Sequence, residues 1–159
     1  MNGKNSKPYA ILVFGAPMSG KTEFATKFSQ KFKAPFLNCE LLPRISREAF
    51  LAVITQIATC EQPMLIEGGI DTFKQRQELR KLLSNAGYHP VTLWIQTDVN
   101  IIKRRLKTTM KSVEKAKTFF EDRFAQLEAP EESEHPIVIS GKHTFEGQLS
   151  SVLSHLSEL

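Results

Sequence analysis

The sequence has few cysteines and no long hydrophobic run, and these two absences exclude several classes of protein. Two cysteines, Cys39 and Cys60, cannot form a disulfide framework, and their apolar surroundings predict buried, reduced thiols. The longest apolar run covers residues 9–16, well short of the roughly 20 residues that a membrane-spanning helix needs. The first residues are polar and lack the apolar core of a secretory signal. We therefore expect a cytoplasmic protein with no membrane partner.

Internal repeats, low-complexity tracts and a flexible linker are also missing. The 159 residues match the size of one domain, which can bury about 70% of the surface of its unfolded chain and needs no disulfide or metal to fold. We expect a mobile tail over residues 1–7 and a single domain over residues 8–159.

Basic residues are concentrated in two stretches, although the formal net charge is only +4. Residues 1–33 contain six lysines and one acid, and residues 98–123 contain eight basic residues and four acids. A general nucleic-acid coat would be more uniform. The two patches favour an anionic small ligand or a polyphosphate.

Short apolar runs alternate with amphipathic stretches along the whole chain. The apolar runs predict strands at residues 9–14, 35–37, 63–67, 91–96 and 136–140. The amphipathic stretches predict helices at residues 21–33, 46–59, 71–85, 99–110, 112–128 and 145–156. This alternation predicts an α/β fold of three layers, in which a five-stranded parallel sheet is flanked by helices on both faces. Ligands of such sheets bind beyond the carboxyl ends of the strands.

The loop after the first expected strand matches a phosphate-binding pattern. Its sequence is Gly15-Ala16-Pro17-Met18-Ser19-Gly20-Lys21-Thr22, which fits G-x-x-x-x-G-K-[ST] between a strand and a helix. In such a loop the backbone N–H groups and the helix N-terminus converge on a nucleotide phosphate. We expect all eight residues to bind nucleotide, with Lys21 on the β- and γ-phosphates and Thr22 also on Mg²⁺.

Other sequence features separate this chain from two large groups of phosphate-loop proteins. No Asn-Lys-x-Asp segment is present to read a guanine, which excludes a GTPase of the Ras type. The third expected strand ends at Glu67 and lacks the acidic pair of many motor ATPases. Glu67 is therefore the single acidic candidate for Mg²⁺, through a water molecule; a structural loop carboxylate is the alternative.

Together these features resemble the small P-loop kinases, nearest to the branch of polynucleotide kinase, zeta toxin and chloramphenicol phosphotransferase. The resemblance spans residues 9–158 and rests on the phosphate loop, with supporting spacings at residues 38–44, 67–76, 98–105 and 128–142. It implies a P-loop NTPase fold with a short helical lid at about residues 100–125. It also implies ATP and Mg²⁺ as cofactors and transfer of the γ-phosphate to a hydroxyl group.

The resemblance gives roles to residues after the second and third strands. Glu40 stands where the family carries the base, usually an aspartate, so the longer side chain changes the geometry; an exposed loop acid is the alternative. Arg44 and Arg76 are the implied contacts with the acceptor substrate. Asp71 either lines the same cleft or, as we expect, caps the helix that follows.

In the lid, the resemblance implies that Arg105 lies over the ATP phosphates and neutralises the charge that develops during transfer. Arg104 is the alternative, and Arg123 is a further lid arginine that can fold toward the phosphates. The family's second lid arginine is replaced by Thr109.

The loop after the fifth strand contains Gly141 and Lys142, which the resemblance places against the adenine; a plain turn without a ligand is the alternative. The acidic stretch at residues 131–134 precedes this strand, and we expect it to be a solvated loop.

The leading interpretation is a kinase with Lys21, Glu40 and Arg105 as catalytic residues, acting on a small molecule or a nucleotide. Two alternatives stay open. Glu40 in place of aspartate and the missing lid arginine also fit a domain that binds or hydrolyses ATP without transfer. The basic charge also fits a polynucleotide-end kinase, which we favour less because the sequence has no aromatic row for stacking single strands.

Overall fold

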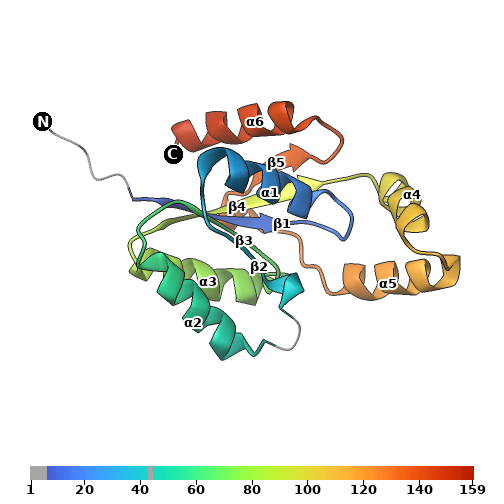
Figure 1. Ribbon diagram of the computed structural model, residues 1–159, viewed down its shortest axis with the longest axis horizontal. Coiled ribbons are helices and arrows are strands. Elements are labelled where there is room, and N and C mark those ends of the chain that lie inside the picture. The colour runs from blue at the N-terminus through green and yellow to red at the C-terminus, as the bar shows by residue number, and fades with distance from the viewer. Residues whose placement is uncertain (1–6, 43–44) are drawn as a thin grey trace, which may run out of the picture.

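Five parallel strands form one sheet in the structure, a computed structural model that describes residues 7–42 and 45–159. The strands are β1 (Tyr9–Phe14), β2 (Phe36–Asn38), β3 (Met64–Glu67), β4 (His89–Gln96) and β5 (Ile137–Ser140). Their order across the sheet is β2-β3-β1-β4-β5, which places the phosphate-loop strand at the centre (Figure 1). The predicted α/β class and the five-stranded parallel sheet are confirmed.

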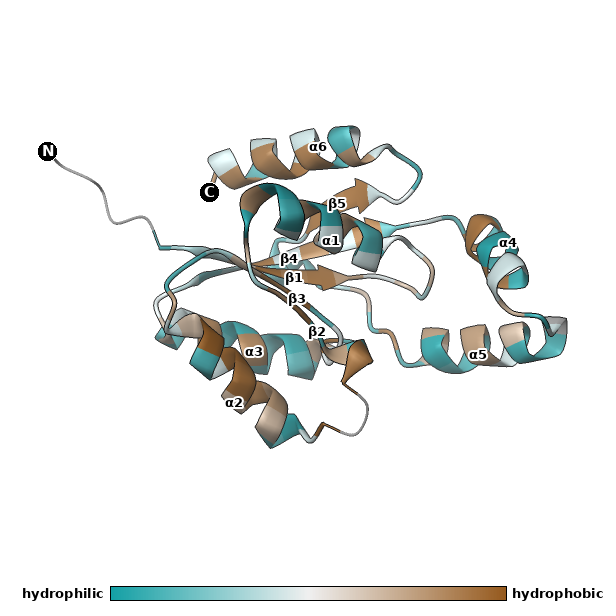
Figure 2. Ribbon diagram, viewed as in Figure 1, coloured by the Kyte–Doolittle hydropathy of each residue, from teal (hydrophilic) through white to brown (hydrophobic). Residues whose placement is uncertain are grey.

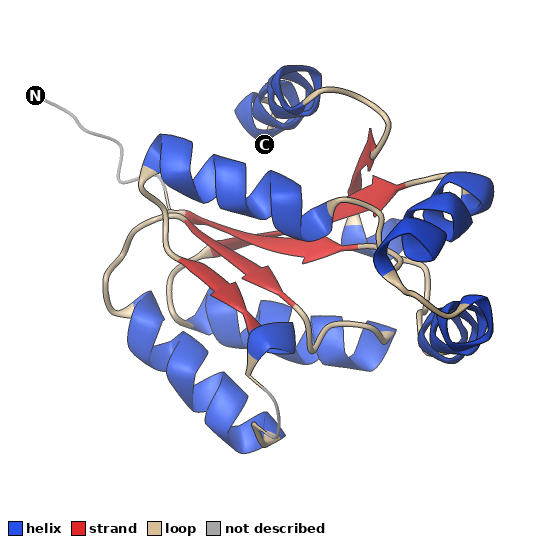
Figure 3. Cartoon of the chain, turned by 45° about the vertical axis from the view of Figure 1, so that its right-hand side comes forward, coloured by secondary structure: helices blue, strands red, loops and turns tan. Residues whose placement is uncertain are grey.

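Within the described residues, six α-helices and two 3₁₀ turns lie between the strands or follow the last one. They are α1 (Lys21–Phe32), η1 (Cys39–Leu41), α2 (Arg47–Ala58), α3 (Phe73–Asn85), α4 (Val99–Thr109), α5 (Val113–Ala125), η2 (Glu132–Glu134) and α6 (Phe145–Ser157). Figure 3 shows α1 and α6 on one face of the sheet and α2 and α3 on the other. The α4–α5 pair stands beyond the carboxyl ends of the strands, where the predicted lid belongs.

The central strand β1 is buried on both faces because its alternate side chains enter two different cores. Ile11 and Val13 pack in the core under α1 and α6, whereas Leu12 and Phe14 pack in the core above α2 and α3. A strand covered on both faces gains from apolar residues at every position, which explains the continuous run in the sequence. Figure 2 shows this strand largely in brown, with teal stretches on the flanking helices α1 and α3.

The first turn of α3 differs from the prediction. The cap is Thr72, whose hydroxyl accepts the N–H of Gln75 while the Gln75 side chain accepts the N–H of Thr72. The expectation that Asp71 caps this helix is therefore wrong. Because the reciprocal cap satisfies the helix end without Asp71, that carboxylate is left to line the cleft.

The cysteines also differ from the prediction of buried thiols. Cys60 is exposed in the turn that follows α2, and Cys39 is half-buried in η1. Burial raises the pKa of the Cys39 thiol to about 11, so it is protonated at neutral pH.

Along the parts of the chain that the structure describes, every helix is too short or too polar to cross a membrane.

Candidate active site

The phosphate loop runs from the end of β1 to the start of α1, and two of its glycines are required by the backbone. Gly15 has a φ of 155°, and a Cβ there would lie 2.5 Å from the Ile95 carbonyl oxygen. Gly20, with a φ of 101°, is the N-cap residue of α1. The loop thus curls tightly at the carboxyl end of the sheet, with the α1 N-terminus directed into it.

Lys21 folds back across the loop from the first position of α1. Its Nζ donates a hydrogen bond to the Ala16 carbonyl oxygen at 3.0 Å, and the residue is 9% exposed. The ammonium group is therefore held at the mouth of the loop by a backbone contact, where a phosphate oxygen can replace the carbonyl.

Thr22 and Glu67 meet beside the loop. The Thr22 hydroxyl donates to Glu67 Oε1 at 2.8 Å, although 45 residues separate them in the sequence. Glu67 is buried at the end of β3, and burial raises its pKa, against the Thr22 hydrogen bond and the nearby Lys21 charge, both of which lower it.

Two buried polar atoms at this point lack a partner within the described ranges 7–42 and 45–159, namely Glu67 Oε2 and Ser19 Oγ. A buried carboxylate oxygen is costly without a partner. A hydroxyl and a carboxylate are the oxygen ligands that Mg²⁺ accepts, directly or through its water shell. Thr22 and Glu67 therefore fit a magnesium ion.

Arg105 joins α4 to the phosphate loop. From α4 its guanidinium donates to the Met18 carbonyl oxygen at 2.9 Å and to the Gly141 carbonyl oxygen at 3.2 Å. Arg104 is exposed, so the structure brings Arg105 rather than Arg104 to the loop. The α4–α5 pair has a small core of its own, in which Leu106 and Phe120 pack and against which Met18 lies.

Gly141 is enclosed between the lid hinge and the phosphate loop. A Cβ at this position would collide with Thr97 Oγ1 and the Ser19 carbonyl oxygen. Thr97 in turn donates to that carbonyl oxygen at 3.0 Å. The hinge between β4 and α4, the phosphate loop and the β5–α6 loop are thus fixed at one point.

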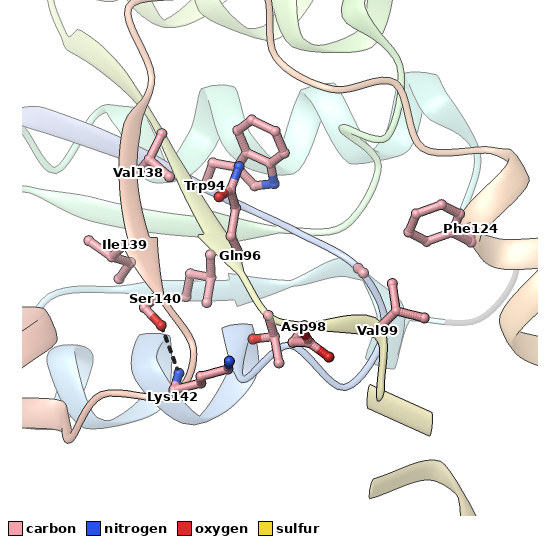
Figure 4. Close-up of a pocket in the computed structure, with 12 residues that line it drawn as sticks. Trp94, Gln96, Asp98, Val99, Phe124, Val138, Ile139, Ser140 and Lys142 are labelled. Carbon is pink, nitrogen blue, oxygen red and sulfur yellow. Dashed lines mark hydrogen bonds between the residues drawn. The ribbon is translucent and has the colours of Figure 1, made fainter. Parts of the chain in front are cut away.

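Two cavities open next to this point. One, of about 370 Å³, lies over the start of α1 between Arg105 and Phe145 and includes Gly141 and Lys142 in its wall. The other, of about 650 Å³, lies along β4 and β5 (Figure 4). There Trp94 and Gln96 project from β4 and Phe124 lies across from them on α5. Both volumes are in the range of small-ligand sites.

A small cavity beside the phosphate loop combines side chains from η1, α5 and the loop after β3. Glu40 of η1 accepts a hydrogen bond from Arg123 of α5 at 3.0 Å, and Asp71 Oδ2 lies 4.0 Å from the same guanidinium. These three side chains, with Lys21 and Pro17, line a cavity of about 30 Å³. Burial raises the pKa of Asp71, and Arg123 opposes that shift. Glu40, placed here by resemblance alone, does lie beside the phosphate loop.

Arg76 does not line this cavity. Its guanidinium is fully buried, forms two hydrogen bonds with Glu134 at 2.8 and 3.1 Å, and donates to the carbonyl oxygens of Ile70 and Asp71. It also lies 4.7 Å from the centre of the Phe14 ring. The prediction that Arg76 contacts the acceptor is wrong, because a buried guanidinium is stable only when its donors are satisfied by the protein.

The expectation of a solvated acidic loop before β5 is wrong because of the same ion pair. Glu134 is 1% exposed, so residues 131–134 are not simply a solvated loop. Arg44, the other implied acceptor contact, lies outside the described residues.

One arginine that the sequence did not single out fixes the loop after β3. Arg47 of α2 donates to the carbonyl oxygens of Gly69 and Gln75 and pairs with Glu78 at 2.7 Å. It ties α2 to the loop after β3. An arginine in the first turn of an amphipathic helix resembles any solvated charge, so the sequence carried no signal for this contact.

No protein-family model matches the sequence, and a search of curated proteins gives no match. Solved structures do match. A gluconokinase from Sinorhizobium meliloti superposes with a TM-score of 0.73 over 96% of this chain and 93% of that one, at 15% identity. A sugar kinase from a Janibacter species gives 0.72 over 96% and 95%, at 19% identity.

A third solved structure contains ligands. The APS kinase of Mycobacterium tuberculosis, in complex with AMPPNP and APS, gives a TM-score of 0.68 over 95% of this chain and 98% of that one, at 15% identity. This chain has the fold of the P-loop kinases. At such identities the likeness shows the fold, so the branch predicted from the sequence stays a prediction.

Proposed function

We propose that the protein is an ATP- and Mg²⁺-dependent phosphotransferase that moves the γ-phosphate to a hydroxyl group. The observation that carries the proposal is the convergence of Lys21, Glu40 and the Thr22–Glu67 pair on one end of the phosphate loop. A site for nucleotide binding alone needs the loop and its lysine. A carboxylate positioned beyond them, at the acceptor end, is what a transfer reaction adds.

Lys21 and Arg105 supply the positive charge for transfer in this proposal. Lys21 exchanges its bond with the Ala16 carbonyl oxygen for the β- and γ-phosphate oxygens. Arg105, already anchored over the loop, neutralises charge shared between the leaving and transferred groups. The adenine occupies the cavity of about 370 Å³ that Gly141 and Lys142 line.

Thr22 and Glu67 would hold the magnesium ion, which when bound neutralises phosphate charge. No group of three or more histidine, cysteine, aspartate or glutamate side chains with metal-binding geometry exists among the described residues. An ion held by one hydroxyl and one carboxylate needs its remaining ligands from nucleotide and water, which is the usual mode for Mg²⁺.

Glu40 is the proposed base. A base must lie within hydrogen-bond reach of the hydroxyl that attacks, and Glu40 shares its cavity with Lys21. We favour a small molecule as acceptor, because the fold relatives are a gluconokinase, a sugar kinase and an APS kinase. A nucleotide acceptor, or a polynucleotide end as in the predicted branch, is the less favoured form of the proposal.

The experiment that tests this function is titration of the protein with ATP in the presence and absence of Mg²⁺, followed by a screen of hydroxyl compounds for transfer of labelled γ-phosphate. We expect magnesium-dependent binding, and a loss of transfer of roughly 100-fold or more for Lys21→Ala. Lys31→Ala, an exposed lysine on the same helix, is the matched control. Absence of ATP and GTP binding, or native turnover by Lys21→Ala, would refute the proposal.

A further inference from the structure

The ion pair between Glu40 and Arg123 links two parts of the site that belong to different elements. Arg123 lies on α5 of the lid, and Glu40 follows β2, 83 residues earlier in the sequence. One oxygen of the carboxylate that the proposed function needs as a base is therefore already hydrogen-bonded. Asp71, at 4.0 Å, offers the same guanidinium a second carboxylate.

The cavity around this pair is too small for an acceptor but large enough for water. Its volume is about 30 Å³, and a water molecule needs roughly 10–15 Å³. In this arrangement, the cavity beside Lys21 has room for water but not for a substrate with several heavy atoms. The site therefore admits water as a nucleophile and excludes the acceptor hydroxyl.

The wrong reaction is hydrolysis of ATP. The oxygen of water would form a bond to the γ-phosphorus while the bond from that phosphorus to the β,γ-bridging oxygen breaks and its electron pair leaves with ADP. The proton of the attacking water would go to the Glu40 carboxylate. A free Glu40 would promote this step as readily as it promotes attack by an acceptor hydroxyl.

We propose that Arg123 is a positioning residue that keeps Glu40 from activating water until the acceptor enters. This inference rests on the proposed function. The charge-assisted hydrogen bond occupies an oxygen of Glu40. Entry of the acceptor moves α5 outward and breaks the bond, so Glu40 becomes available when its proper substrate is present. Asp71 then retains Arg123, so that the guanidinium is not left without a counter-charge.

The position of the lid supports this role. The α4–α5 pair stands away from the sheet (Figure 1), and α5 closes the cavity with Phe119, which is 42% exposed, as well as with Arg123. Glu128, just beyond α5, is hydrogen-bonded to Asp71 and Phe73 and marks where the chain stays attached. The helix itself packs with α4 in a small separate core, so it can move at lower cost than an element of the main core.

The test measures ATP hydrolysis in the absence of any acceptor, so it does not require the acceptor to be known. We expect Arg123→Met to raise the hydrolysis rate at least about fivefold over the native protein. Lys117→Met, an exposed lysine on the same helix, should leave the rate within about twofold. Adding Glu40→Gln to Arg123→Met should return the rate to the native level or below, because the released base is gone. Arg123→Lys should stay below Arg123→Met, since a lysine can still pair with Glu40.

Binding of Mg²⁺-ATP, measured calorimetrically for each variant, separates the two proposals. If the native protein binds Mg²⁺-ATP and Arg123→Met does not hydrolyse it faster, or if Glu40→Gln does not remove the gain, the inference about Arg123 is overturned and the proposed function stands. If the native protein does not bind Mg²⁺-ATP, both are overturned.

The thermal midpoint of each variant checks folding. Arg123→Gln, with a rate expected to match Arg123→Met, serves where the methionine variant is unstable.

Discussion

The phosphate loop and the acceptor end of the site are held in place by different kinds of contact. In the loop, Lys21 and Arg105 both donate to backbone carbonyl oxygens of the loop itself, Ala16 and Met18. At the acceptor end, Arg47 also donates to backbone carbonyl oxygens, but Glu40 is held by the side chain of Arg123 from a distant segment. Backbone contacts fix one geometry, whereas a pair of exposed side chains can separate when a ligand competes. This difference fits a nucleotide that binds to a preformed loop and an acceptor substrate whose entry separates the Glu40–Arg123 pair.

The largest expected effect concerns the buried ion pair beneath the acceptor end. Arg76→Met leaves Glu134 as an unpaired buried charge, and breaking such a pair costs about 3–5 kcal/mol of stability. Denaturant unfolding measures this loss. Adding Glu134→Gln should recover part of it, because the charge then no longer needs a partner. A single variant with native stability would show that this pair does not hold the acceptor end.

The second-largest expected effect is the loss of ATP affinity caused by Gly141→Ala. The new Cβ collides with Thr97 Oγ1 and the Ser19 carbonyl oxygen, so the hinge and the loop must move apart. We expect ATP binding to weaken by about tenfold or more, measured by calorimetry. Gly147→Ala is the control, since its Cβ would meet only ordinary contacts at 3.6 Å and beyond. Equal affinities in the two variants would contradict the close fit around Gly141.

Arg105→Met should have a smaller effect on binding than on transfer. It removes two hydrogen bonds, to Met18 and to Gly141, and a charge that acts mainly as transfer proceeds. We expect ATP affinity to fall by a few-fold and transfer, once an acceptor is found, by roughly 100-fold. Arg104→Met, on the same helix and exposed, should change neither. If ATP affinity fell more than transfer did, Arg105 would act mainly in binding ATP and not in stabilising the transition state.

The smallest expected effect is a pH dependence of stability from Glu67. Because burial raises its pKa above the unfolded value of 4.5, the native state binds the proton more tightly than the unfolded state. The contribution of Glu67 to stability is therefore greatest at low pH and declines as pH rises from 4.5 through the native pKa. Denaturant unfolding of the native protein and of Glu67→Gln at several pH values measures this effect. The two should be most alike at low pH, where both side chains are neutral, and the native protein should lose stability relative to Glu67→Gln as pH rises toward neutral. A native protein that gains stability relative to Glu67→Gln with rising pH would contradict the sign.

Most of the fold followed from local pattern, and the exceptions have a common cause. The start of α3 was misplaced because Asp71 and Thr72 are both good capping residues, and only the backbone conformation selects Thr72. Cys60 was expected to be buried because apolar residues surround it in the sequence, yet it lies in an exposed turn. In each case the local sequence allows two outcomes, and the conformation of the folded backbone selects one of them.

The strands and the phosphate loop can be predicted from the amino-acid sequence, because a buried strand and a glycine loop followed by Lys21 and Thr22 depend on contiguous residues. The pairing of the charged side chains around the site follows from the packing of distant segments. Arg76 is paired with Glu134 across 58 residues and Arg123 with Glu40 across 83. An arginine carries the same charge wherever it stands, and its role is set by burial and by the carboxylate within a few ångströms, neither of which a local pattern contains.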